Sequence, residues 1–189
     1  MARQLPVAVC LLLAFATAGA HPHAYVDQQA LISVGTHSVD VTVRIVPSFT
    51  EGAAIFARID SDSDGKVSDR EAAELAAAVV ATVQLEVDGM PVALHRATAV
   101  VPGVDEVSAG FGVIEISAAA AIVLAGSGNH QVSFNIGFDD FSADWQVQPY
   151  FYTDLVTAMS SRSIARNETG NGVNILLYSP GGSPSNTLY

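Results

Sequence analysis

Beyond the first twenty positions, the chain alternates between apolar and polar residues. Apolar side chains occupy every second position from 39 to 45, with polar ones between them, which is typical of a half-buried strand. Val26, Ala30, Ile32 and Val34 give the preceding segment the same character, and residues 35–38 separate the two runs. We therefore predict that these two strands form a hairpin.

The same period returns in the second half of the chain. Residues 83–87 alternate, and Asp88-Gly89 favours a two-residue hairpin turn into a strand at 92–94. Further strands are expected near 111–116, 131–138, 146–152 and 173–178, while 118–124 fits either a strand or a helix. About seven or eight strands at this spacing predict an antiparallel β-sandwich over residues 21–179.

The alternation breaks between the second and third predicted strands, where residues 49–83 show a helical period. We expect one helix from Glu51 to Ile59, capped by Ser48 or Thr50, and a second over residues 69–82. The apolar positions expected to face the core are Ile55, Phe56 and Ile59 in the first helix and Leu75, Val79 and Val80 in the second. A helical hairpin is therefore inserted into the β domain.

The twelve residues between these helices read DSDSDGKVSDRE, and their oxygen-bearing side chains are spaced to converge on one centre. A Ca²⁺ ion takes six to eight oxygen ligands, and the glycine at the sixth position permits the sharp turn that such a loop needs. The expected ligands are the carboxylates of Asp60, Asp62 and Asp64, the backbone carbonyl of Lys66, Ser68 directly or through water, and both oxygens of Glu71.

Helix, loop and helix in this order resemble an EF-hand, and the resemblance covers this segment alone. The alternative interpretation is a solvated acidic loop that matches the pattern by chance. No internal repeat supplies a second hand. A single hand on a β domain indicates a structural calcium site, because calcium sensors usually pair their hands.

Residues 1–20 have the features of a secretory signal peptide: Arg3, an apolar run, and Ala18-Gly19-Ala20 before the expected cleavage site. The run is too short for the ~20 apolar residues of a membrane span. Cys10, the only cysteine, would leave with the signal, so the processed chain would have no disulfide. We expect secretion into a Gram-negative periplasm and no integral membrane span after cleavage.

The chain has a formal net charge of −11, and loss of Arg3 with the signal takes it to −12. Such a charge disfavours nucleic acid as a partner. Residues 180–189 are rich in glycine, proline and small polar residues, and we expect them to form a disordered tail. The oligomeric state is left open.

Cleavage after Ala20 would place His21-Pro22-His23 at the new N-terminus, where an α-amine and two imidazoles suit copper, nickel or zinc. Pro22 has no N–H and so blocks the square-planar mode that uses deprotonated backbone amides. The alternatives are a mobile polar terminus, or a metal clasp completed by a distant His37, His95 or His130, which we otherwise expect to be ordinary surface residues.

The HPH start, the valine-rich hairpin, the DxDxDG segment and the GNHQVSF strand together resemble small bacterial periplasmic proteins of unassigned role and extracytoplasmic domains associated with nickel/cobalt-type transporters. This resemblance implies a metal-handling role and an envelope metal-transport partner.

No nucleophile elbow, HExxH motif or phosphate loop is present, so we expect a calcium-binding protein that is not an enzyme. The alternative is a transition-metal accessory protein, or a copper enzyme, that uses His21. The acids Asp139, Asp140 and Asp144 beside Trp145 fit a second metal or sugar site less well than a solvated turn.

Overall fold

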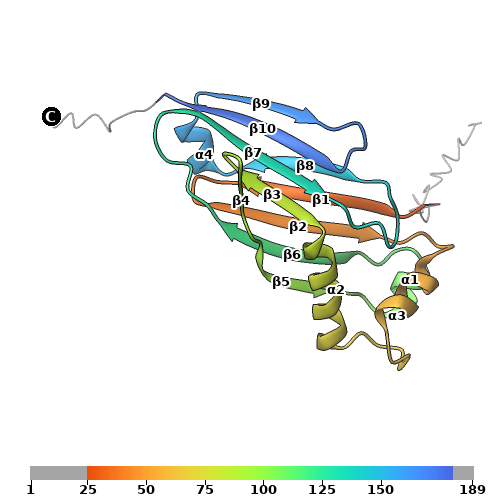
Figure 1. Cartoon of the computed structure of the whole chain (residues 1–189). Coiled ribbons are helices and arrows are strands. Elements are labelled where there is room, and N and C mark those ends of the chain that lie inside the picture. Colours follow the sequence, from red (N-terminus) through yellow and green to blue (C-terminus); the bar gives the residue numbers. More distant parts are fainter. Residues whose placement is uncertain (1–24, 181–189) are drawn as a thin grey trace, which may run out of the picture.

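The computed structural model describes residues 25–180, and within them ten strands form two five-stranded sheets with four helices (Figure 1). The strands are β1 (Asp27–Val34), β2 (Ser38–Val46), β3 (Val83–Val87), β4 (Met90–Pro91), β5 (His95–Val100), β6 (Ile114–Ala121), β7 (Gly128–Ile136), β8 (Gln146–Phe151), β9 (Ser161–Arg166) and β10 (Gly172–Ser179). The helices are α1 (Gly52–Ile59), α2 (Asp69–Ala81), α3 (Val104–Ser108) and α4 (Thr153–Ala158). The prediction of a β-rich fold is confirmed.

One sheet has the order β5-β6-β2-β1-β8 and the other the order β4-β3-β7-β10-β9. The predicted hairpin of β1 and β2 is confirmed, and its turn is closed by a bond from the Gly35 N–H to the Ser38 carbonyl at 2.8 Å. The expectation of purely antiparallel sheets is wrong at one edge, because β8 pairs with β1 in parallel. That pairing joins segments more than a hundred residues apart, so no local turn signals it.

Buried side chains from both sheets contribute to one hydrophobic core. Along β1 and β2, buried and half-buried residues alternate as the period of two requires. Ile32 and Ile45 from one sheet and Phe134 and Ile175 from the other are at most 1 % exposed and belong to one cluster of buried residues. The alternating pattern in the sequence therefore correctly identified the buried positions.

Several predicted element boundaries are wrong. The Asp88-Gly89 turn leads into β4 at Met90–Pro91 rather than a strand at 92–94, and β6 begins at Ile114 rather than at residue 111. Of the ambiguous segment 118–124, residues 118–121 continue β6 as a strand, and residues 122–124 belong to neither a strand nor a helix. Strands β5 and β9 and helices α3 and α4 were not predicted. The two strands lie at sheet edges and are largely exposed, so their side chains do not alternate strongly.

In the sequence, the helical insert falls between β2 and β3, as predicted. In space, it lies at one end of the sheets (Figure 1). Helix α2 packs against β5 and β6, and α1 packs against α3. An added Cβ at Gly52 would lie 2.0 Å from the Val107 carbonyl oxygen, so α1 and α3 approach too closely there for a side chain. This packing holds the start of α1, at Gly52, against α3.

The predicted cap of α1 is wrong. The N-cap residue is Glu51, whose side chain makes no capping bond, while Ser48 Oγ accepts a bond from the Glu51 N–H at 3.2 Å and closes the turn before the helix. By contrast, the predicted apolar positions Ile55, Phe56 and Ile59 are all buried.

The predicted signal peptide, the metal ligands His21 and His23, and residues 181–189 of the predicted tail lie outside the described residues. Between residues 25 and 180, no helix is long and apolar enough to cross a membrane.

Candidate metal centre

The acidic loop folds around its own carboxylates. Asp60, directly after α1, is 5 % exposed, and its two oxygens accept bonds from the N–H groups of Asp64 at 3.2 Å and Gly65 at 2.9 Å. Gly65 has a φ of +83° and Ser63 a φ of +60°, so the chain turns back at both positions. The sequence pattern correctly placed a glycine where the left-handed conformation is required.

Glu71 is the second buried carboxylate, also 5 % exposed, and it closes the loop from the other side. Its Oε1 accepts bonds from the Ser61 N–H at 2.6 Å and the Ser61 hydroxyl at 2.8 Å. Its Oε2 accepts a bond from the Ser68 N–H at 2.9 Å, and Ser68 Oγ accepts one from the Glu71 N–H, which makes a capping box at the start of α2. The Ser-x-x-Glu spacing could have revealed this box from the sequence.

Oxygens of Asp60, Asp62 and Glu71 all lie within 4.8 Å of one another, so the three carboxylates could hold a metal ion. These were three of the predicted ligands. Within residues 25–180 this is the one such group of three or more acidic, histidine or cysteine side chains.

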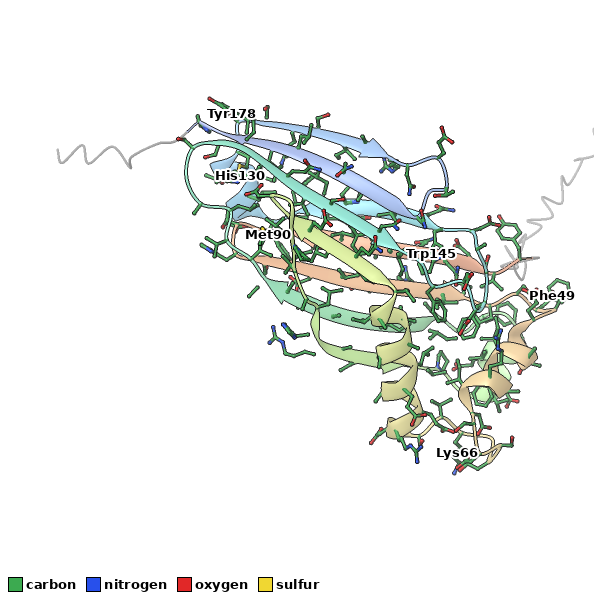
Figure 2. The ribbon with its side chains drawn as sticks, in the orientation of Figure 1. Phe49, Lys66, Met90, His130, Trp145 and Tyr178 are labelled. Carbon is green, nitrogen blue, oxygen red and sulfur yellow. The ribbon has the colours of Figure 1, made fainter. Side chains whose placement is uncertain are left out.

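The other predicted ligands are outside this group. Asp64 is exposed, and its Oδ1 accepts a bond from the Lys66 N–H at 2.8 Å. The Ser68 hydroxyl donates to Glu71 Oε2 at 2.9 Å. Lys66 is exposed at the outer end of the insert, away from both sheets (Figure 2). Ser61 was not among the predicted ligands, and its role is to orient Glu71.

The hydrogen bonds and charges of the loop shift its carboxyl groups in opposite directions. The Ser68 N–H, then the hydroxyls of Ser61 and Ser68, lower the pKa of Glu71 to about 2. A bond from the Asp64 N–H lowers the pKa of Asp62, but desolvation and the charges of Asp64 and Glu71 outweigh it, so that the pKa of Asp62 is raised. Glu71 is therefore held ionised. The neighbouring negative charges raise the pKa of Asp62.

We expect Glu71 to make the metal-free protein acid-sensitive in a defined window. Because its folded pKa is depressed from 4.5 to about 2, its stabilising effect is fully present above pH 4.5 and is lost as the pH falls through about 2. Urea unfolding of metal-free wild type and Glu71→Gln at several pH values would measure it. The stability difference between the two should be constant above pH 5 and shrink below pH 4; a difference that stays constant to pH 2 would contradict this assignment.

The histidines within the described residues do not converge on a second site. His37 lies in the β1–β2 turn as expected, and His95 begins β5 rather than ending a strand. The expectation that His130 is an ordinary surface residue is wrong: it is 8 % exposed, and its Nδ1 lies 2.8 Å from Asp88 Oδ2. Desolvation raises the pKa of Asp88, but bonds from His130 and the Gln131 N–H lower it below its usual value. This contact locks the turn after β3.

The acids near Trp145 form no metal-binding group with one another within the described residues. Trp145 is 6 % exposed, and its Nε1 donates to the Phe138 carbonyl oxygen at 2.8 Å. Its ring is therefore part of the core and anchors the loop that carries Asp139, Asp140 and Asp144.

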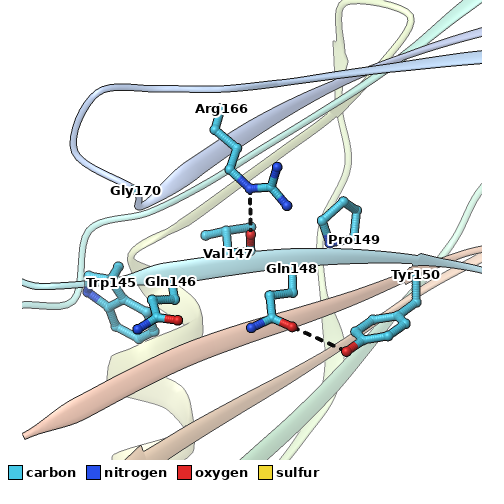
Figure 3. A pocket seen from close by; sticks show the side chains of 8 residues that line it. All are labelled: Trp145, Gln146, Val147, Gln148, Pro149, Tyr150, Arg166 and Gly170. Atoms are coloured by element: carbon cyan, nitrogen blue, oxygen red, sulfur yellow. Dashed lines mark hydrogen bonds between the residues drawn. The ribbon is translucent and has the colours of Figure 1, made fainter.

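A groove of about 440 Å³ follows the free edge of β8 (Figure 3). Arg166 Nε donates to the Val147 carbonyl oxygen at 3.3 Å, and Gly170 accepts a bond from the Val147 N–H at 3.2 Å. Pro149 has no N–H to present at this edge. The two contacts and the proline leave fewer free backbone N–H and C=O groups at the edge of β8. They therefore disfavour addition of another strand.

No family model matches the chain. No curated protein matches it either.

Proposed function

We propose that the protein binds one calcium ion in the loop between α1 and α2 and that it is not an enzyme. The observation that carries the proposal is the approach of the Asp60, Asp62 and Glu71 oxygens to within 4.8 Å of one another. Carboxylate oxygens are hard ligands, which calcium prefers over the nitrogen and sulfur ligands of softer metals.

The remaining ligands would come from the same twelve residues. In this proposal Asp64 adds a third aspartate, Lys66 its backbone carbonyl, and Ser68 a contact through water, while Glu71 binds through both oxygens. The flexible, oxygen-rich set favours Ca²⁺ over Mg²⁺, because Mg²⁺ requires a smaller octahedral shell and releases its water reluctantly.

The ion would stabilise the fold rather than trigger a conformational change. We propose that the two sheets face each other as a β-sandwich and that calcium fixes the helical insert at its end. One hand without a partner suits a dissociation constant of about 10⁻⁴ to 10⁻³ M, the range of extracellular calcium modules. This range agrees with export to the periplasm, which is part of the same proposal.

The test is a calcium titration of purified protein after chelation and dialysis. We expect one calcium per chain by isothermal titration and by elemental analysis, with Mg²⁺ at equal concentration displacing little of it. Absence of heat and of bound calcium at 10 mM, with a native far-ultraviolet spectrum, would overturn the proposal.

A further inference from the structure

A cavity of about 220 Å³ lies between the helical insert and the β7–β8 loop, which comprises residues 137–145. Side chains of α1, of α2 and of this loop line it. The acidic loop also contributes, because Ser61 and Glu71 line the same cavity. The cavity therefore borders both the candidate calcium centre and the β7–β8 loop.

The two helices carry the buried carboxylates of the calcium centre next to apolar walls of this cavity. Ile59 ends α1 directly before Asp60, and Leu75 follows Glu71 by about one turn of α2. Ile59 is 6 % exposed and Leu75 is 9 % exposed, and both line the cavity and belong to the hydrophobic core. The separation of the two helix ends therefore sets the separation of Asp60 and Glu71.

The β7–β8 loop contributes two aromatic rings to the cavity. Phe138 is buried and Phe141 half-buried, and their rings pack edge to face with centroids 5.2 Å apart. Arg58, in the last turn of α1, donates to the Asp140 carbonyl oxygen. Its guanidinium carbon also lies 5.9 Å from the centre of the Phe141 ring, which is a cation–π contact. Arg58 thus holds the loop to the helix that leads into Asp60.

The rest of the β7–β8 loop is fixed to the β domain. Trp145 donates from Nε1 to the Phe138 carbonyl oxygen at 2.8 Å. Gln28 of β1, which is buried, donates from Nε2 to the carbonyl oxygens of Ser142 at 2.6 Å and Asp144 at 3.3 Å. The loop therefore connects the buried part of the sheets to the end of α1, where the acidic loop begins.

We propose that the β7–β8 loop takes the place of a second hand: its docking at the cavity holds Asp60 and Glu71 at the separation that calcium binding requires. Arg58 and Phe141 are the positioning residues of this contact, and neither provides a ligand to the ion. The inference rests on the proposed calcium function. If only the docked form binds calcium, the apparent dissociation constant rises as the docked fraction falls. By the same linkage, bound calcium stabilises the docked loop.

The test is isothermal titration of the whole protein with CaCl₂. We expect Phe141→Ala to bind at least about fivefold more weakly, the lower end of the coupling between linked sites. Arg58→Met keeps an apolar stem and removes the guanidinium, and should bind about two- to fivefold more weakly, the factor that an exposed cation–π contact represents. Charge alone predicts the opposite, because loss of a nearby cation favours Ca²⁺. Stronger binding by Arg58→Met would overturn the proposal.

Phe151→Ala is the matched control. Phe151 is half-buried and lies 5.0 Å from the guanidinium carbon of Arg162, but it belongs to β8 and does not line the cavity. Its loss should lower stability and leave calcium affinity within about twofold, as expected for a site that shares no partners with the calcium centre. Equal calcium affinities of Phe141→Ala and Phe151→Ala would contradict the positioning role.

Hydrogen exchange supplies a readout that a purely structural role would not change. In the wild type, amides of residues 137–145 should exchange more slowly with calcium than with EGTA, and Phe141→Ala should lose this difference. Arg58 is exposed, so Arg58→Met should fold and decides the question if Phe141→Ala does not. A wild type that takes up no calcium would overturn this inference together with the calcium function. One bound calcium per chain with unchanged exchange of residues 137–145 would overturn this inference alone.

Discussion

Replacing Glu71 by glutamine is expected to weaken calcium binding at least ~100-fold, or about 2.8 kcal/mol of binding free energy. Glutamine removes one negative charge and one of the two oxygens that a bidentate carboxylate offers, and places an amide N–H₂ group beside the cation. Asp60 and Asp62, with Asp64 as the proposed third aspartate, would then be the remaining carboxylates of the site. Isothermal titration with calcium measures the change.

This substitution separates metal binding from folding. Glutamine is accepted at the third position of a capping box, because its side-chain carbonyl can still accept the Ser68 N–H. Helix α2 should therefore form in Glu71→Gln, and its far-ultraviolet spectrum should match the wild type. Ser68→Ala provides the reverse case: loss of the cap costs about 1 kcal/mol of stability, while calcium affinity falls only mildly.

The matched control is Glu74→Gln, one turn further along α2. Glu74 is exposed, pairs with Arg70 at 2.8 Å, and is not part of the carboxylate group. Its removal should leave calcium affinity within about twofold, because surface pairs of this kind contribute little. If Glu71→Gln and Glu74→Gln bind calcium equally well, the assignment of the loop is wrong.

The acidic loop was predictable because its chemistry is local. Its predicted ligands lie within twelve consecutive residues, and the glycine at position 65 has the positive φ that the turn requires. The exposed orientation of Asp64 was not predictable, because it depends on which backbone N–H groups the folded loop offers to each carboxylate.

Features that depend on distant partners were not predictable from the sequence. His130 is buried, and its Nδ1 lies 2.8 Å from Oδ2 of Asp88. Asp88 comes 42 residues earlier and is a turn residue with a φ of +51°. Edge strand β9 is exposed at every position, so nothing in its composition distinguishes it from a loop. Local periodicity thus predicted the central strands, whereas pairing at the sheet edges and polar contacts between elements require the fold.

Removal of calcium is expected to lower the melting temperature of the loaded protein by roughly 5–11 °C. Free calcium at 100 times its dissociation constant adds about 2.7 kcal/mol to stability. One kcal/mol corresponds to about 2–4 °C for a domain of this size. The single tryptophan, Trp145, is buried and reports unfolding by fluorescence. Scans with calcium and with excess EGTA measure the shift.

The loss of stability on removal of calcium should be concentrated in the helical insert. Without the ion, five acids of residues 60–71 repel one another, and the loop alone joins α1 to α2. Both helices contribute buried side chains to the core, including Ile59 and Leu75, so loosening the loop weakens their packing against it.

Hydrogen exchange can therefore locate the effect. Amides of α1 and α2 should exchange faster after EGTA, while those of β7 and β10, paired along eight residues, should not change. EGTA should leave Glu71→Gln unaffected at the same calcium concentration. A loaded wild-type protein whose melting temperature and exchange rates are indifferent to EGTA would show that the ion, though bound, does not brace the insert.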